Sequence, residues 1–373
     1  MKITDVETII VRQPGGITLI GDGTQDTCIV LVHTDAGITG AAEVDSAPYV
    51  LKSIIEMPAS HQACQGLRDL VVGEDPFDVE KIWNKMYEFA YYHGRAAAVI
   101  HAMSGIDNAI WDIMGKATGL PCHKLLGGAY RSEIPAYISI LMPSTVEEVK
   151  ALVAHHMKEG YCGIKFGWGN LGQNINKDIE LVKAAREALG PDKILMIDIA
   201  MAWNDYKVAL KACKEFEKYN VYWVEEPFRV DREKDFVKLR DNTSLNISTG
   251  EEFFSFEEFR SYIDSGACDI IQPDISRCGG LTVAKKVRDY AYPKGVRVVP
   301  HNFKSGLLLS ATLQFIATIP NALFLEYCGQ ETVLSRNLIK DPIEAVNGIV
   351  KIPTKPGMGF ELEWDTINKY RVD

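Results

Sequence analysis

Short apolar runs alternate with amphipathic stretches from residue 134 to residue 326. Each apolar run has the length of a buried strand, and a stretch with helical spacing of apolar positions follows before the next run begins. The helices expected after the second and later runs are 177–189, 206–218, 231–240, 255–265, 281–293 and 306–318. Strands joined by helices lie parallel, so this alternation predicts an α/β barrel of the TIM type.

Capping signals mark two of the helix starts in the barrel region. Ser144 and Ser255 are each followed three residues later by a glutamate, Glu147 and Glu258. In such a capping box the two side chains bind the free backbone N–H groups of the first turn. We therefore expect helices to begin directly after both serines.

The segment before the barrel has a different pattern. Residues 2–12 and 28–44 read as strands of an antiparallel meander, and residues 79–117 carry an apolar stripe at helical spacing. The stripe predicts a helix that packs on a core. Asp107 and Asp112 within it are expected to be charges on the helix surface or at an interface.

Three segments of the chain are expected to have separate roles. We predict an α+β capping domain over residues 1–128, a barrel over 129–330, and an irregular C-terminal segment over 331–373 that packs back on the capping domain. The Gly-rich segment 15–26 is too rich in glycine for a stable helix or strand. It is either disordered or a lid over a site.

Composition narrows the class of protein. The 373 residues are 47% hydrophobic and carry a net charge of −10, which argues against nucleic acid as a partner. No apolar run is long enough to span a membrane, and the first residues lack the apolar core of a signal peptide. The eight cysteines are scattered without a CxxC pair, as is typical of free thiols in the cytoplasm.

One reactive side chain follows each apolar run from the second onward. These residues recur about every 25 positions: Lys165, Asp198, Glu225, Glu251, Asp274, His301 and Glu326. Parallel strands place all their C-terminal ends on one rim of the barrel, so we expect the seven side chains to meet in one mouth.

Three adjacent carboxylates of this set predict a metal site. Asp198, Glu225 and Glu251 would repel one another unless a cation lay among them. Oxygen ligands without cysteine suit a hard divalent ion, so we expect one Mg²⁺ per subunit, with Mn²⁺ as the second choice. Glu226 and Glu252 are the sequence neighbours, and strand alternation allows only one glutamate of each pair into the mouth. We expect Glu226 to bond a lysine on the rim.

The other four residues suit proton removal next to a carboxylate. His301 paired with Asp274 has the fixed tautomer and raised basicity of a general base. Lys165 could neutralise a substrate carboxylate, and Glu326, if protonated, could donate a hydrogen bond to a developing oxyanion.

Further side chains could reach the mouth or simply pack. They are Tyr91, His93, Arg95, Trp168 and Trp203. Packing is the favoured role for the two tryptophans. Trp203 is nevertheless kept, with Asn302, as a candidate substrate contact.

Together these motifs resemble the enolase superfamily, in its mandelate racemase/muconate lactonizing enzyme-like branch. The resemblance covers essentially the whole chain and lies in the order and spacing of its motifs. They are Ala109-Ile110-Trp111-Asp112 through Leu125-Leu126-Gly127-Gly128, Ile197-Asp198, Trp223-Val224-Glu225-Glu226-Pro227, Thr249-Gly250-Glu251-Glu252, Gln272-Pro273-Asp274 with Cys278-Gly279-Gly280, Pro300-His301-Asn302-Phe303 and Phe324-Leu325-Glu326-Tyr327.

The resemblance implies a fold and a site. The fold is a modified TIM (β/α)7β barrel beneath an α+β capping domain, in a chain that assembles as a homo-oligomer, a dimer or an octamer. Mg²⁺ would lie on the three carboxylates, His301 and Asp274 would form a dyad, and Glu326 would face the enolate oxygen. Loops near 15–26 and around Ser46-Ala47-Pro48 would close the site and set specificity.

Two positions depart from the pattern of the branch. The second strand commonly carries Lys-x-Lys, whose second lysine is a base, but here the motif reads Lys165-Phe166-Gly167. An asparagine often stands where this chain has Ala200. The site therefore lacks one of the two bases that racemisation uses, unless another residue takes its place.

A site with one base favours dehydration. The histidine would remove the α-proton and then, as imidazolium, help the β-hydroxyl leave, which would convert a sugar acid, an aldonate or aldarate, to a 2-keto-3-deoxy acid. One alternative is an isomerase, either a sugar-acid lactone cycloisomerase or an epimerase with a second base. Another is a relative that binds metal but has lost catalysis.

Overall fold

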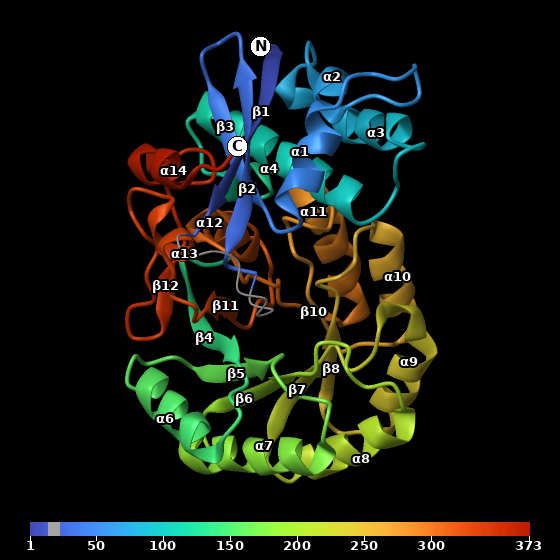
Figure 1. The fold of residues 1–373 in the computed structure, drawn as a ribbon, viewed down its shortest axis with the longest axis vertical. Coiled ribbons are helices and arrows are strands. Elements are labelled where there is room, and N and C mark those ends of the chain that lie inside the picture. The colour runs from blue at the N-terminus through green and yellow to red at the C-terminus, as the bar shows by residue number, and fades with distance from the viewer. Residues whose placement is uncertain (14–22) are drawn as a thin grey trace.

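A curled sheet of parallel strands forms the lower body of the molecule, and a smaller antiparallel sheet with its helices lies above it (Figure 1). The computed structural model describes residues 1–13 and 23–373. The strands of the large sheet are β4 (Glu133–Leu141), β5 (Gly163–Gly167), β6 (Ile194–Asp198), β7 (Val221–Glu225), β8 (Asn246–Thr249), β9 (Ile270–Ile271), β10 (Arg297–Val298) and β11 (Leu325–Cys328). Their spatial order is β10-β9-β8-β7-β6-β5-β4-β11, so neighbours in sequence are neighbours in space except where β11 returns to β4.

One helix connects each strand of this sheet to the next. These helices are α6 (Val146–Met157), α7 (Ile175–Leu189), α8 (Tyr206–Glu217), α9 (Glu233–Asn242), α10 (Phe256–Ser265), α11 (Gly280–Ala291) and α12 (Gly306–Ala317). The result is the predicted (β/α)7β barrel. Helix α12 is buried along its whole length because it packs against the capping domain as well as the barrel.

The capping box of the first barrel helix lies one residue later than predicted. Thr145, and not Ser144, is the N-cap of α6, and its hydroxyl and backbone N–H pair with the N–H and side chain of Glu148. Ser255 is the N-cap of α10 and accepts from the Glu258 N–H at 3.3 Å, as expected, but the Glu258 side chain accepts from the Phe254 N–H at 2.9 Å and not from that of Ser255. The prediction for α6 was wrong by one residue because Ser144-Thr145 and Glu147-Glu148 each offer two adjacent candidates. The sequence alone does not show which member of each pair forms the cap.

A residue beyond β10 and a residue within β11 join the two ends of the sheet. The backbone N–H of Asn302, beyond β10, donates to Glu326 Oε2 on β11 at 2.9 Å, and the Asn302 side chain donates to the Glu326 carbonyl at 3.2 Å. Asn302 is 2% exposed. Its Oδ1 has no hydrogen-bond partner among the described residues, so the role of Asn302 as a substrate contact stays a prediction.

The capping domain has an antiparallel sheet with helices on one side. Its elements are β1 (Ile3–Arg12), β2 (Asp26–Thr34), β3 (Thr39–Val44), α1 (Pro48–Glu56), α2 (Leu67–Val71), α3 (Val79–Phe89), α4 (Ala98–Thr118) and α5 (Cys122–Leu125). Short 3-10 turns span Pro76–Asp78, Val230–Arg232 and Tyr292–Lys294. The single helix predicted over 79–117 is thus two helices, separated by a turn in which Ala97 has a φ of 49°. The predicted Gly-rich lid falls mainly on residues 14–22, which lie outside the described residues.

Helix α4 carries Asp107 and Asp112, which were expected on the helix surface or at an interface. Both lie at an interface. Both are 1% exposed. Asp107 accepts from the Thr282 backbone N–H and hydroxyl at 3.0 and 2.6 Å, which links the cap to α11 of the barrel. Asp112 accepts from the Ala41 and Met358 N–H groups at 3.0 and 2.8 Å.

The C-terminal segment contacts the cap, and it is less irregular than expected. It contains α13 (Val333–Asn337), β12 (Ile349–Lys351) and α14 (Trp364–Tyr370). Strand β12 pairs antiparallel with β4 of the barrel, and the Val372 N–H donates to the Ile10 carbonyl of β1 at 2.9 Å. The segment therefore touches both parts of the molecule, and the boundaries at 128 and 330 stay a prediction.

Two expectations from composition can be compared with the fold. All eight cysteines are free thiols, and most are buried. Within residues 1–13 and 23–373, none of the helices combines the length and apolarity that crossing a bilayer would require.

Candidate active site

A cavity of about 210 Å³ lies at the C-terminal ends of the barrel strands, beneath the cap. Its lining residues are Gly23, Asp45, Ser139, Ile140, Leu141, Lys165, Gly167, Trp168, Asp198, Glu251, Arg277, His301, Phe303 and Glu326. Five of the seven predicted rim residues are among them. The other two, Glu225 and Asp274, lie directly behind the wall and contact residues that line it.

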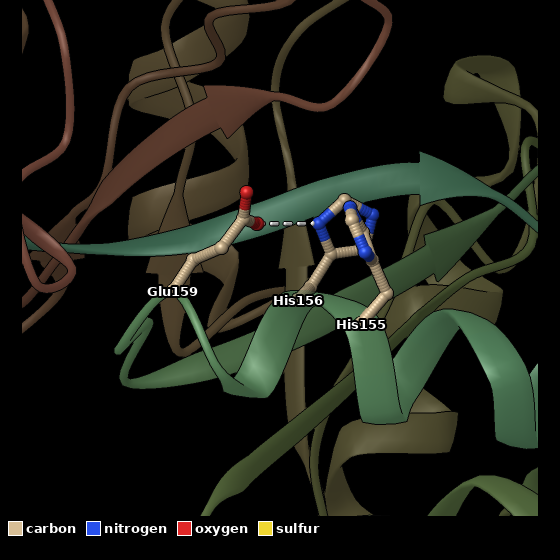
Figure 2. Close-up of side chains that lie close together, drawn as sticks. All are labelled: His155, His156 and Glu159. Atoms are coloured by element: carbon tan, nitrogen blue, oxygen red, sulfur yellow. Dashed lines mark hydrogen bonds and ion pairs between the residues drawn. The ribbon is translucent and has the colours of Figure 1, made fainter.

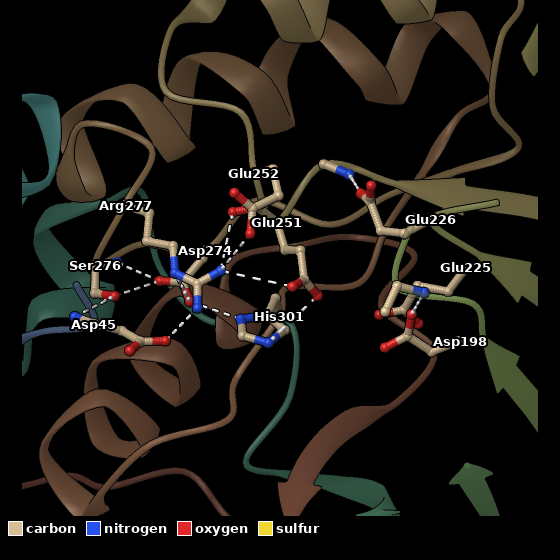
Figure 3. A network of polar contacts seen from close by, with 12 residues as sticks. Asp45, Asp198, Glu225, Glu226, Glu251, Glu252, Asp274, Ser276, Arg277 and His301 are labelled. Carbon is tan, nitrogen blue, oxygen red and sulfur yellow. Dashed lines mark hydrogen bonds and ion pairs between the residues drawn. The ribbon is translucent and has the colours of Figure 1, made fainter. Parts of the chain in front are cut away.

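Parallel register brings the three predicted metal ligands together. Asp198 pairs with Glu225 across β6 and β7, and Glu251 follows β8 (Figure 3). Each of the three offers a carboxylate oxygen within 4.8 Å of the others, and all three are buried. Burial and the neighbouring carboxylates raise the pKa of both Asp198 and Glu225. Three buried oxygen donors that repel one another fit a hard divalent cation.

Lys165 is the cation that faces these carboxylates from β5. Its ammonium lies 2.6 Å from Glu225 Oε1, 2.7 Å from Glu326 Oε1 and 3.9 Å from Asp198 Oδ2. Burial lowers its pKa, but Glu225 and Glu326 outweigh burial and raise the pKa well above its usual value. Lys165 is therefore a fixed positive charge at the metal end of the cavity.

The glutamate next to Glu225 is held differently from the prediction. Glu226 accepts from the Thr249 hydroxyl at 2.7 Å and from the Gly250 N–H at 2.9 Å, and no lysine contact is found among the described residues. Burial raises its pKa to about 8. Glu226 thus fixes the loop that carries Glu251, so it supports the metal ligand from behind.

His301 and Asp274 form the predicted pair. His301 Nδ1 lies 2.7 Å from Asp274 Oδ2, and Asp274 Oδ1 accepts from the Ser276 N–H and hydroxyl, each at 2.6 Å. Burial raises the pKa of Asp274, but His301 and Arg277 lower it, so the carboxylate is ionised and Nδ1 carries the proton. The other ring nitrogen, Nε2, lies 3.5 Å from Glu251 Oε2 at the edge of the metal triad.

The surroundings of His301 also change its basicity. Burial lowers the pKa of His301, but the charges of Glu251 and Glu326 and the bond to Asp274 raise it to about 10. A cation on Glu251 would offset part of this field.

The surroundings of Glu326 favour its ionised form, whereas donation to an oxyanion would require the protonated form. Burial alone would raise its pKa, but the charges of Lys165 and His301 lower it to about 2. Its Oε2 accepts from the Asn302 N–H at 2.9 Å. In this arrangement Glu326 binds Lys165 as an anion.

Sequence reasoning missed a second group of charged residues at the end of the cavity that faces the cap. Asp45, which follows β3, forms an ion pair with Arg277 from the loop after β9 (Figure 3). Asp45 Oδ1 also lies 2.8 Å from the Lys304 ammonium. Arg277 was detectable as a lone cation three residues after Asp274. Neither Asp45 nor Lys304 has a local signal, because their contacts depend on how the cap sits on the barrel.

The predicted peripheral contacts divide into two groups. Trp168 lines the cavity and is 39% exposed, although packing was its favoured role. Trp203 is 2% exposed and packs near the ring of Phe216, so it lies outside the lining. Arg95 stacks on the exposed ring of Tyr91, 4.4 Å from its centroid, away from the lining residues. His93 contacts the Cys64 thiol and is likewise not in the lining.

Gly167 stands where the branch commonly has a second base, and the structure gives a reason for glycine. It pairs with Asp198 across β5 and β6. A Cβ at this position would lie 2.8 Å from Asp198 Oδ2 and 2.9 Å from Asp198 Cβ. A side chain here would therefore press on a candidate metal ligand.

A second group of metal-binding side chain types lies on the protein surface, at the end of α6. His155, His156 and Glu159 are drawn together in Figure 2. Glu159 Oε2 already binds His156 Nδ1 at 2.8 Å, and the His156 ring lies near that of Tyr161. Imidazoles at a helix C-terminus are favoured by the helix dipole, so the contacts present account for this group.

Comparison with known families matches both parts of the chain. The model described as mandelate racemase/muconate lactonizing enzyme, N-terminal domain, matches residues 2–127. The model described as enolase C-terminal domain-like matches residues 147–366.

Individual relatives match over most of their length. A D-galactarolactone cycloisomerase of Agrobacterium fabrum is 32% identical, over 81% of this chain and 82% of its own. A D-xylonate dehydratase of Haloferax volcanii is 28% identical, over 100% of this chain and 89% of its own. Among solved structures, the 3,6-anhydro-D-galactonate cycloisomerase of Zobellia galactanivorans has a TM-score of 0.90 at 29% identity, with both chains fully covered.

Proposed function

Because the chain belongs to the mandelate racemase/muconate lactonizing enzyme branch of the enolase superfamily, we propose that it is a Mg²⁺-dependent acid sugar dehydratase. It would remove the proton α to a substrate carboxylate and expel the β-hydroxyl, which gives a 2-keto-3-deoxy acid. The observation that carries this proposal is the position of His301, held by Asp274, at the edge of the Asp198, Glu225 and Glu251 triad.

The three carboxylates are the proposed ligands. Mg²⁺ bound there would supply positive charge beside the substrate carboxylate, which makes the α-proton more acidic. The burial of the triad supports this assignment, because electrostatic effects are larger away from water. Glu226 holds the loop of Glu251, so it would keep the third ligand in place.

His301 is the proposed base. Asp274 holds the Nδ1 proton, so when the ring is neutral the lone pair is on Nε2 at the cavity wall. After taking the α-proton there, the imidazolium can return it to the β-hydroxyl as water leaves. One side chain thus serves both half-steps, provided that both substrate groups face it.

Lys165 and Glu326 are proposed to stabilise the negative charge that develops on the substrate carboxylate. The Lys165 ammonium lies in the cavity wall beside two of the proposed ligands, where it would bind the substrate carboxylate. When it does so its contact with Glu326 loosens, and Glu326, once it takes up a proton from solvent, could donate to a developing oxyanion while Lys165 keeps its charge. Burial favours the neutral form of Glu326 once the lysine charge is engaged elsewhere.

The other side of the cavity supports dehydration over two-base racemisation. Gly167 has no side chain, and the wall beside it is made of Ile140, Leu141 and Trp168. Of the ionisable lining residues described near Gly167, Asp198 is a proposed metal ligand, and the pKa of Lys165 is raised. A single base on one face suits elimination.

Isomerisation is the second candidate, since two of the relatives are named as cycloisomerases. A cycloisomerase also needs proton transfer at the α-carbon, and the same His301 could deliver it. A relative without catalysis is less well supported, because the triad, the dyad and Lys165 are all kept.

Incubation of the Mg²⁺-loaded protein with hexonates, pentonates, aldarates and their lactones tests the proposal. Formation of a 2-keto acid is the expected result. Ring opening or closure without a keto acid would establish the isomerase instead. Absence of both, and of α-proton exchange in D₂O, would refute the proposed chemistry altogether.

A further inference from the structure

Gly23 and Asp45 of the cap line the cavity, and Arg277 of the barrel lines it beside Asp45; these three residues are its cap-facing end. We infer that this cap-facing end selects sugar acids with one carboxylate, and that Asp45 excludes a second carboxylate at the far end of the substrate. The inference rests on the proposed function, and it separates aldonates from aldarates.

Asp45 presents a fixed negative charge to the cavity. Its carboxylate forms an ion pair with Arg277 and lies 2.8 Å from the Lys304 ammonium, while its backbone N–H donates to the Ser276 hydroxyl at 3.2 Å. Burial would raise its pKa, but the two cations lower the pKa well below its usual range. Asp45 is 8% exposed and lines the cavity, so a ligand would meet a carboxylate there.

Arg277 has little positive charge left for a ligand. Its guanidinium pairs with Asp45, and it also lies 3.6 Å from Glu251, 3.5 Å from Glu252 and 3.8 Å from Asp274 (Figure 3). One cation thus serves four carboxylates. A further anion would have to compete with groups that are held in place by the fold.

The lysines that lie near the cavity, Lys304 and Lys165, are also engaged. Lys304 binds Asp45 and the Gly23 carbonyl, and it does not line the cavity. Lys165 lies at the metal end, against Glu225 and Glu326.

Charge and hydrogen bonding together define the preferred ligand. A hydroxyl group can donate to Asp45 Oδ1 or Oδ2, whereas a second carboxylate offers only acceptors and repels the aspartate. The distal carbons of an aldonate carry hydroxyls, and an aldarate carries a carboxylate at that end. The cavity is also small enough that the distal group cannot lie far from its wall.

Matched pairs of acids test the inference. Binding of gluconate against glucarate, and of galactonate against galactarate, is measured by calorimetry with Mg²⁺ present, and turnover is measured in parallel. We expect each aldonate to bind at least tenfold more tightly than its aldarate. An aldarate that binds as tightly as its aldonate would overturn the inference.

The Asp45→Asn variant assigns the preference to this residue. It should reduce the aldonate-to-aldarate ratio at least fivefold, whereas Asp5→Asn, which alters the Arg68 ion pair of the same cap outside the cavity lining, should leave it unchanged. If the aldonate-to-aldarate ratio of the folded Asp45→Asn variant is unchanged, Asp45 is not the residue that excludes the second carboxylate. Should that variant fail to fold, the wild-type ratio still decides whether the site excludes diacids.

The two proposals fail in different ways. Loss of keto-acid formation with every sugar acid, while aldonates still bind selectively, would refute the dehydratase and leave the charge selection intact. Formation of a 2-keto acid from aldarates as fast as from aldonates would refute the charge selection and leave the dehydratase intact.

Discussion

The two sides of the cavity differ in what their side chains are free to do. On one side His301 has a single strong partner, Asp274, and its second nitrogen faces the cavity wall. On the other side, β5 offers Lys165, which two carboxylates hold at 2.6 and 2.7 Å, and Gly167, which has no side chain. The difference teaches that a reactive residue type is not enough: a base also needs an accessible lone pair.

Loss of the His301 imidazole should have the largest effect on catalysis. His301→Asn keeps a hydrogen-bonding group of similar size but removes the base, so kcat should fall at least about a hundredfold. Exchange of the α-proton in D₂O should fall with it, because proton removal precedes loss of the hydroxyl. Steady-state kinetics and NMR of the substrate measure both.

A matched histidine controls for folding. His123 is also buried, at 4% exposed, but it binds Gln314 on α12 and does not line the cavity. His123→Asn should leave kcat within about twofold even if it lowers the melting temperature. Retained exchange in His301→Asn would show that the β5 side supplies a base after all.

The β5 side can be tested by adding a single methyl group. In Gly167→Ala the new Cβ meets Asp198 Oδ2 at 2.8 Å, so the carboxylate must move. We expect Mg²⁺ affinity to fall about tenfold, as when a group that orients a metal ligand is disturbed. Calorimetric titration of the substrate-free protein with Mg²⁺ gives this value without any turnover.

Another glycine of the same strand provides the contrast. A Cβ at Gly163 would meet the Ile194 carbonyl oxygen at 2.4 Å, at the opposite end of β5 from the triad. Gly163→Ala should therefore lower the free energy of unfolding by about 1–3 kcal/mol and leave Mg²⁺ affinity unchanged. Equal Mg²⁺ affinities in both variants would disprove the role assigned to Gly167.

The barrel and its rim were predictable because their signal is local and repeated. A strand, a reactive residue and a helix recur at nearly constant spacing, and parallel pairing then forces residues such as Asp198 and Glu225 onto one rim. The sequence did not reveal which of two adjacent glutamates faces inward. That choice depends on the turn after β7, where Glu226 adopts a φ of 42° and binds the next loop.

The cap-facing end was out of reach for a different reason. Asp45 and Lys304 are about 260 residues apart in sequence, and their contact exists only after the cap has docked on the barrel. Neither residue belongs to a run or a spacing pattern that would mark it. Charges that meet across two packed units are set by tertiary packing, which periodicity does not encode.

The smallest effect is expected from the two tryptophans, which sharpen the boundary between wall and core. Trp168 lines the β5 side of the cavity, so Trp168→Phe should raise KM about threefold by removing part of the apolar wall. Trp203 is buried beside Phe216, so the same change there should lower the free energy of unfolding by about 1–2 kcal/mol with KM unchanged. Kinetics and denaturant titration of both variants separate the effects. A change in KM for Trp203→Phe alone would return Trp203 to the substrate contacts, as its sequence position first suggested.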